Sequence, residues 1–120
     1  MSTLNVKLTL GNTSALSDVI SFNVSDALDV TSPSEMSRIN VLHASPTELA
    51  AGATGAHYVY IKHISSTNTK PVDIRIASGT AYGQIATGEF AFIPCKVNLG
   101  VEVIAIDETV VVEYAIFKKA

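Results

Sequence analysis

The stretch HYVYIKHI, residues 57–64, alternates its side chains with a period of two. One face carries Val59 and Ile61, and the opposite face carries two tyrosines and a lysine. This alternation is typical of a β-strand, because successive side chains of a strand point to opposite faces of a sheet. Large side chains on both faces predict a strand that packs against something on each side.

Further strands are expected on both sides of this stretch, separated by turn residues about every 8–12 positions. No segment keeps a helical period for more than a turn or two. We therefore expect one all-β domain, an antiparallel β-sandwich of jelly-roll or immunoglobulin-like type with about eight or nine short strands. The absence of tryptophan argues against a true immunoglobulin domain. The other expected strands are 4–10, 20–24 continued by 28–30, 37–44, 72–76, 82–85, 89–93, 101–106 and 109–117.

The connections between these strands are predicted from turn chemistry. Residues 31–34 and the small-residue segment 45–55 are expected to be loops. The pair Asp107-Glu108 is close to a two-residue hairpin connection, which predicts a hairpin of the last two strands. Pro94 cannot donate to a strand ladder, so its strand is expected to end there or to lie at a sheet edge.

The composition indicates that part of the surface is covered. The chain has 120 residues, of which 48% are hydrophobic and 16% are charged, whereas soluble domains average about 25% charged residues. A domain of this size has a high ratio of surface to volume, so we expect the apolar surplus to be buried against copies of the chain or another partner. The chain is therefore expected to form a homo-oligomer.

The charge pattern argues against two classes of partner. The net charge is −3 and no basic block occurs, which argues against binding of nucleic acid. Acidic residues interrupt the longest apolar stretches, and the first residues lack the charged and apolar regions of a signal peptide. We therefore expect neither a signal peptide nor a membrane segment. The single cysteine, Cys95, excludes a disulfide within the chain.

A glycine-rich stretch, GTAYGQIATGEFAFIP at residues 79–94, has glycines at positions 79, 83 and 88. A phosphate-binding loop needs Gly-Lys-Ser/Thr before a helix, and a dinucleotide-binding loop needs G-x-G-x-x-G before a helix. Neither pattern is present. We therefore expect turn glycines with positive φ around a short strand, and no bound cofactor.

No catalytic or metal-binding set is predicted. His57 and His63 share one face of a strand but lie about 20 Å apart at about 3.3 Å per residue, too far to bind one metal ion. His43 adds only one further ligand. Cys95 has no helix N-terminus to activate its thiol, and the G-x-S-x-G motif of serine hydrolases is absent. The chain is therefore expected not to be an enzyme.

Apolar side chains outside the expected core are candidate contact residues. Phe90 and Phe92 are expected to fill the core, which puts Ile93 on a covered outer face. Tyrosines often lie in subunit interfaces, where the ring is buried and the hydroxyl stays wet. Residues 1–12 are expected to act as a docking arm or an added strand, because a terminal strand is free to reach a neighbour. The candidate interface residues are Leu4, Val6, Leu8, Leu10, Tyr58, Tyr60, Ile93 and Tyr114.

Five segments resemble small virion structural proteins of tailed bacteriophages, namely residues 57–62, 72–76, 82–85, 87–94 and 112–117. The resemblance lies in strand and turn patterns over about half of the chain. It implies a non-enzymatic capsid decoration, or cement, protein that binds the major capsid protein or other virion proteins and stabilises subunit junctions. Such a protein is made in the host cytoplasm, ends up in the virion and needs no cofactor.

Two other roles stay open. The resemblance also includes neck and tail components of such virions. A carbohydrate-binding β-sandwich module is the alternative from a different class, because Tyr58 and Tyr60 share a face on which a sugar could stack. Modules of that class usually use tryptophan, and this chain has none.

Overall fold

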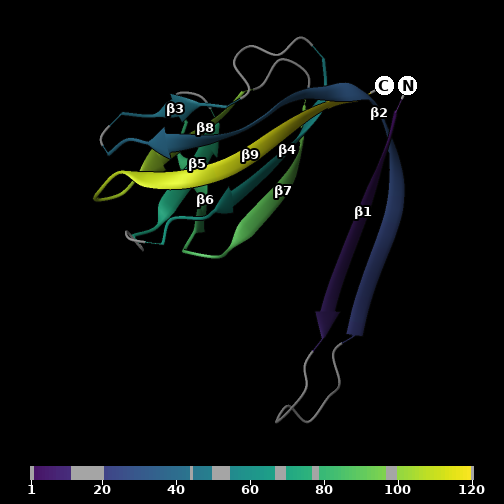
Figure 1. Cartoon of the computed structure of the whole chain (residues 1–120), viewed down its shortest axis with the longest axis horizontal. Helices are drawn as coiled ribbons and strands as arrows, with labels where there is room; N and C mark the ends of the chain where they lie inside the picture. The colour runs from purple at the N-terminus through teal and green to yellow at the C-terminus, as the bar shows by residue number, and fades with distance from the viewer. Residues whose placement is uncertain are drawn as a thin grey trace.

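The computed structural model describes residues 2–11, 21–43, 45–49, 55–66, 70–76, 79–96 and 100–119. Within these ranges every regular element is a β-strand and no helix occurs (Figure 1), so the prediction of an all-β domain is confirmed. The described strands are β1 (Ser2–Gly11), β2 (Ser21–Val41), β3 (Thr47–Glu48), β4 (His57–His63), β5 (Val72–Ile76), β6 (Ala81–Ile85), β7 (Phe90–Cys95), β8 (Val101–Ala105) and β9 (Val110–Lys119).

The strands form two sheets, which confirms the predicted antiparallel sandwich. The five-stranded sheet has the order β1-β2-β9-β4-β7, and the four-stranded sheet has the order β3-β8-β5-β6. Every pairing between the named strands is antiparallel. β1 and β7 are the two edges of the larger sheet, so the edge position predicted for the strand of Pro94 is also confirmed.

The core lies between the sheets and is built from alternate residues of the central strands. In β4, Val59 and Ile61 are 0% exposed, as the alternation predicts. Val103 of β8 and Val112 of β9 are buried to the same extent. Burying one such aliphatic side chain contributes about 1.5–3 kcal/mol relative to leaving it exposed. These rows of side chains hold the two sheets together.

The predicted hairpin of the last two strands is wrong. β8 pairs with β3 and β5 in the smaller sheet, whereas β9 pairs with β2 and β4 in the larger sheet. The connection at Asp107-Glu108 therefore crosses from one sheet to the other. A turn residue favours a local change of direction, but it does not choose which distant strand supplies the hydrogen bonds.

β2 is one continuous strand where the sequence predicts separate strands at 20–30 and 37–44 and a loop at residues 31–34. The predicted loop is therefore wrong. The pairing of β2 with β9 shifts register between Val30 and Pro33, and again between Pro33 and Glu35. Irregularities of this kind bend a strand and accommodate a proline, which cannot donate to the ladder. The 21 residues of β2 would span about 70 Å at about 3.3 Å per residue. Because the longest dimension of the molecule is 43 Å, β2 must curve.

β1 and residues 21–30 of β2 form a hairpin, which we call the arm. Figure 1 shows the arm extending away from the sandwich. The Cα radius of gyration is 15.6 Å, compared with about 14 Å for a compact domain of this length. The projecting arm accounts for the larger value. It contains residues 2–11 of the predicted docking arm, and whether they dock on a partner stays a prediction.

Two smaller predictions differ from the structure. The segment 45–55, predicted as a loop, contains β3, which pairs with β8; residues 50–54 lie outside the described residues. The strand predicted at 37–44 is the end of β2 and stops at Val41. His43 makes an isolated bridge to Ala105, and residue 44 lies outside the described residues.

Of the three glycines in residues 79–94, only Gly88 has a positive φ, at 84°. The prediction of positive-φ turn glycines is therefore correct for Gly88 and wrong for the other two. Gly79 is needed for a close approach, because an added Cβ would lie 3.1 Å from the carbonyl oxygen of Ile76. Gly83 lies within β6, next to a register shift in the pairing with β5.

Replacing Gly88 by alanine is expected to lower the free energy of unfolding by about 1–2 kcal/mol, the cost of a left-handed conformation for an L-residue. Nothing lies within 4 Å of the added Cβ, so backbone strain alone causes the loss. The control is Gly83→Ala, whose Cβ would make an ordinary contact 3.9 Å from Ile74. Denaturant unfolding measures both variants, and equal losses would contradict the assignment.

Candidate functional site: the groove between arm and sandwich

The arm has one apolar face because of the register between its two strands. Leu8 lies opposite Val24, and Leu10 lies opposite Phe22. Directly opposed residues of an antiparallel pair point to the same face. These four side chains therefore form one apolar surface, whereas polar side chains such as Thr9 point the other way.

The apolar face of the arm is exposed toward the tip. Leu10 is 50% exposed and Phe22 is 61% exposed, whereas Leu4 and Val6, nearer to the sandwich, are half-buried. The alternation in residues 4–10 thus predicts the apolar face correctly, but only its inner end is buried. Soluble monomers rarely leave large contiguous apolar patches uncovered.

The face of the larger sheet that points away from the core, which we call the outer face, carries a second apolar surface. The rings of Tyr58 and Phe92 stack with their centroids 5.4 Å apart and an interplanar angle of 16°. A pair of this kind contributes about 0.5–1.5 kcal/mol beyond its buried area. Cross-strand register arranges the outer face in rows: Pro94, Tyr58 and Phe117 in one, and Phe92, Tyr60, Ala115 and Met36 in the next.

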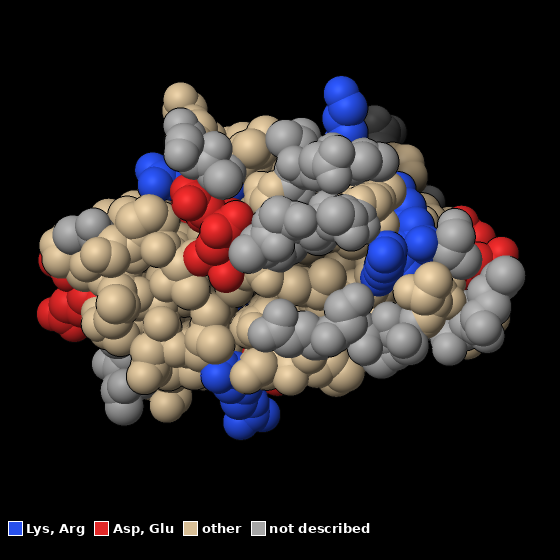
Figure 2. Space-filling model, turned by 90° about the horizontal axis from the view of Figure 1, so that it is seen from above, with Lys and Arg blue, Asp and Glu red and all other residues tan. Residues whose placement is uncertain are grey.

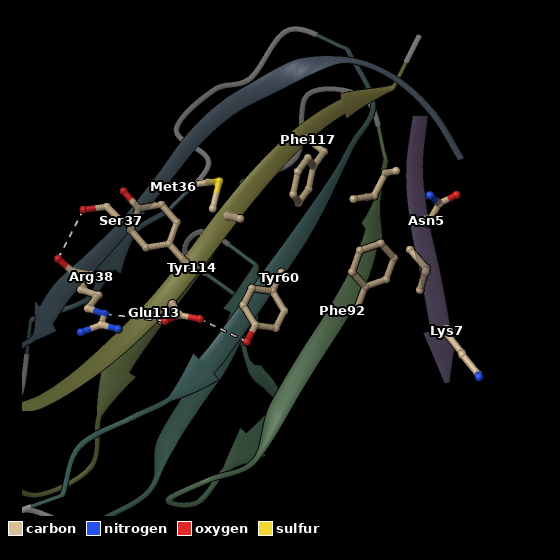
Figure 3. Close-up of a pocket in the computed structure, with 13 residues that line it drawn as sticks. Asn5, Lys7, Met36, Ser37, Arg38, Tyr60, Phe92, Glu113, Tyr114 and Phe117 are labelled. Carbon is tan, nitrogen blue, oxygen red and sulfur yellow. Dashed lines mark hydrogen bonds and ion pairs between the residues drawn. The ribbon is translucent and has the colours of Figure 1, made fainter. Parts of the chain in front are cut away.

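The arm and the outer face enclose a groove of about 530 Å³. Leu4 and Val6 line it on the arm, and aromatic residues line it on the sheet. Figure 3 shows the rings of Tyr60, Phe92 and Phe117 on the sheet side, while Lys7 of β1 points away. The groove is therefore an apolar surface between two parts of one sheet.

A second hollow, which we call the cleft, lies between the arm and β7 and has a volume of about 510 Å³. Leu8 and Val24 line it on the arm, and Phe90 and Pro94 line it on the sheet. Phe90 is 56% exposed. Protein interiors leave few voids larger than a water molecule, so these two apolar walls are not closed against each other within one chain.

One end of the groove carries a polar network. The Tyr60 hydroxyl donates to Oε1 of Glu113 at 3.4 Å, and Nε of Arg38 lies 3.6 Å from Oε2 of the same carboxylate (Figure 3). Burial raises the pKa of Tyr60, and the charge of Glu113 and this hydrogen bond raise it further. The phenol therefore stays protonated at neutral pH. The Arg38 side chain is 72% exposed, so its ion pair contributes at most about 1 kcal/mol.

Charged side chains also face the cleft. Nζ of Lys119 lies 4.8 Å from the ring centroid of Tyr58, within the range of a cation–π contact. Asp26 of the arm lines the same cleft, and its carboxylate accepts the amide hydrogen of Ala27 at 2.8 Å. Figure 2 shows that charges occur in small separate groups on the face in view and that uncharged residues cover most of the described surface there.

Six of the eight predicted interface residues are brought together by the groove and the cleft. They are Leu4, Val6, Leu8, Tyr58, Tyr60 and Tyr114, which line these hollows. Leu10 lines neither hollow but lies on the same apolar face of the arm. Whether they contact a partner stays a prediction. Phe22 and Val24, which oppose Leu10 and Leu8 on the arm, were not among the predicted interface residues. The alternation in residues 20–24 indicates that these two side chains share a face, but only the register with β1 shows that it is the apolar face of the arm.

The predicted sides of Ile93, Phe90 and Phe92 are wrong. Ile93 lies opposite Val59 in the β4–β7 pairing and therefore packs against the core. Phe90 and Phe92, predicted in the core, lie on the outer face instead. Tyr114 lines the groove, but it also belongs to the core cluster and is only 6% exposed. Alternation separates two faces of a strand, but the pairing partner decides which face is inside.

The histidines of β4 act as core side chains. Nε2 of His63 lies 2.8 Å from the carbonyl oxygen of Lys70, and Nδ1 of His57 lies 3.2 Å from that of Gly55. A carbonyl only accepts, so these nitrogens carry the hydrogen. The other ring nitrogen of each histidine has no partner in the described residues. No group of three His, Cys, Asp or Glu side chains suited to a metal ion occurs in those residues.

The thiol of Cys95 is expected to react slowly with alkylating reagents. Burial raises the pKa of its thiol, and Lys119 opposes this only in part. Because the thiolate is the nucleophile, we expect alkylation by iodoacetamide at pH 8 to be at least about tenfold slower than for an exposed cysteine, and to accelerate only at higher pH. The control is Ile106→Cys in a Cys95→Ser chain, since Ile106 is 43% exposed. Equal rates at pH 8 would show that Cys95 is accessible.

Comparisons with protein-family models, curated proteins and solved structures gave no match. In the part of the chain that the structure describes, no helix has the length and apolarity needed to cross a membrane.

Proposed function

We propose that this chain is a non-enzymatic structural protein of a tailed-bacteriophage virion, and that it serves as a capsid decoration protein. The observation that carries the proposal is the arm, which projects from a well-packed sandwich and presents an apolar face. An apolar surface of this size that is held outside a core is typical of a protein contact site.

The shape of the groove supports a role in assembly. It lies between strands, and its lining includes Leu4, Val6 and several aromatic residues, with charged groups gathered at one end. Such a surface fits apolar protein segments better than a small polar substrate, which needs several converging polar groups. The two edges of the larger sheet, β1 and β7, also offer unpaired backbone groups to an added strand.

The assignment to a phage virion rests on the resemblance of the strand and turn segments. Residues 57–62, 72–76, 82–85 and 112–117 lie in β4, β5, β6 and β9, and residues 87–94 comprise most of β7 and the turn before it. Capsid decoration proteins sit over junctions of capsid subunits, which is a role for a compact sandwich with an extended contact arm. The neck or tail role differs only in location, so the same experiment separates the two.

The test is immunogold electron microscopy of virus particles released by the organism that carries the gene, with an antibody against the purified chain. Label on the heads is the expected result. Label on the neck or tail would support the second role. Unlabelled particles, with the protein recovered only in the particle-free fraction, would overturn the proposal.

The carbohydrate-binding alternative has less support. A sugar platform needs a free aromatic ring face. The ring of Tyr58 is already stacked on Phe92 and contacted by Lys119, and the hydroxyl of Tyr60 is bonded to Glu113. Binding on a glycan array that disappears in Tyr58→Ala would nevertheless revive this function.

A further inference from the structure

We infer that the arm of one copy binds in the cleft of a second copy, so that two chains exchange arms. This inference names the partner of the arm and rests on its proposed role in assembly. It does not depend on which particle the protein belongs to, and its test uses the purified chain alone.

The two walls of the cleft are both apolar, but they do not pack against each other within one chain. The arm supplies Leu8 and Val24, and the outer face supplies Phe90 and Pro94, across a space of about 510 Å³. Removing both walls from water is favourable. A second copy carries the same two walls, so each arm can cover the outer face of the other chain.

Charge is complementary across the same cleft. Asp26 lies on the arm, and Lys119 lies on the outer face, with both lining the hollow. Within one chain, no ion pair joins these two side chains in the described residues. An arm from a second copy brings its own Asp26 toward Lys119 and also fixes the orientation of the contact.

Residues 30–35 of β2 form an irregular segment that can act as a hinge between the arm and the sandwich. The pairing of β2 with β9 is irregular from Val30 to Glu35, with Pro33 at the centre. The arm lies on one side of this hinge and the sandwich lies on the other. Because β1 pairs only with residues 21–30 of β2 among the described strands, the arm can rotate about the hinge without disrupting the core. Exchange of an element between protomers requires such a rotation.

Reciprocal exchange covers four surfaces, namely two arms and two outer faces. If each surface has the size of the largest apolar patch on a typical monomer, about 300–600 Å², the four together reach the size of a standard protein interface, about 1,600 Å². A single arm on an unrelated surface would bury only two such surfaces.

The test is crosslinking between two full-length variants that carry one cysteine each, Val24→Cys and Phe90→Cys, both in a Cys95→Ser chain. The two variants carry different tags, are co-expressed, and are treated with a short bismaleimide after purification. We expect at least about a tenfold higher yield of mixed-tag product than for a control pair, Val24→Cys with Ile106→Cys.

Three results would overturn the exchange. The first is a yield equal to the control. The second is preferential coupling of two Val24→Cys chains, which would mean that arms pack against arms. The third is that, at the concentration at which the mixed pair is tested, a single chain that carries both cysteines crosslinks within itself and gives no product between chains, because the arm would then close on its own sandwich. Labelled phage heads together with any of these would leave the proposed function standing without arm exchange.

Discussion

Replacing Leu10 and Phe22 by serine is expected to weaken self-association at least about 100-fold while leaving the sandwich folded. Both side chains are half or more exposed in one chain and belong to the apolar face of the arm that the proposed exchange would cover. Burying one such side chain in the contact contributes about 1.5–3 kcal/mol to the free energy of association, and serine removes this contribution. A loss of about 1.4 kcal/mol raises Kd tenfold, so two substitutions raise it at least about 100-fold. Sedimentation velocity over a concentration series measures the dissociation constant.

The matched control lies on the other face of the same hairpin. Thr9 and Asn23 oppose each other, so Thr9→Ala with Asn23→Ala changes two positions at the same depth in the arm without removing apolar surface. We expect this variant to associate like the unchanged chain. An equal loss in both double variants would mean that the arm tolerates no substitution, and an unchanged Kd in the serine variant would exclude the apolar face from the contact.

Replacing Ile61 by alanine is expected to lower the free energy of unfolding by about 2–5 kcal/mol, the largest effect of a single substitution in this account. Ile61 is 0% exposed and belongs to the core cluster. Its strand, β4, pairs with β7 on one side and β9 on the other. The cavity left behind cannot be filled by a movement of either neighbour without loss of pairing.

Denaturant unfolding of the monomeric double-serine chain measures this loss without a contribution from association. Ile106→Ala is the matched control, because the same chemical change is made at a residue that is 43% exposed. We expect the control to lose less than about 1 kcal/mol. Similar losses in the two variants would contradict the assignment of the core to the β4 face.

The regular strands could be predicted from the sequence because their signal is local. β4 and β5 alternate over their whole length, and both strands lie where the pattern puts them. The position of Phe90 and Phe92 was not predictable in this way, since large rings are usually assigned to a core. The β4–β7 register puts these rings on the outer face, and that register depends on residues about thirty positions apart.

The arm was predicted only in part. The alternation in residues 4–10 predicts one apolar face of β1, whereas docking of residues 1–12 on a neighbour stays a prediction. The sequence could not show that β2 runs through Pro33 as one bent strand, because its turn-forming residues look like a loop. The crossing at Asp107-Glu108 was missed for a related reason: partner choice in a sheet is set by long-range pairing.

Backbone hydrogen exchange of the full-length chain, compared between dilute and concentrated samples, tests the role of the arm most directly. A two-stranded hairpin alone is only marginally stable, so an uncovered arm exchanges fast through local opening. The account predicts that residues 2–11, 21–30 and 90–95 become at least about tenfold slower together as concentration rises, while β5 does not change. Equal rates in the arm at all concentrations would contradict the claim that a second copy covers it.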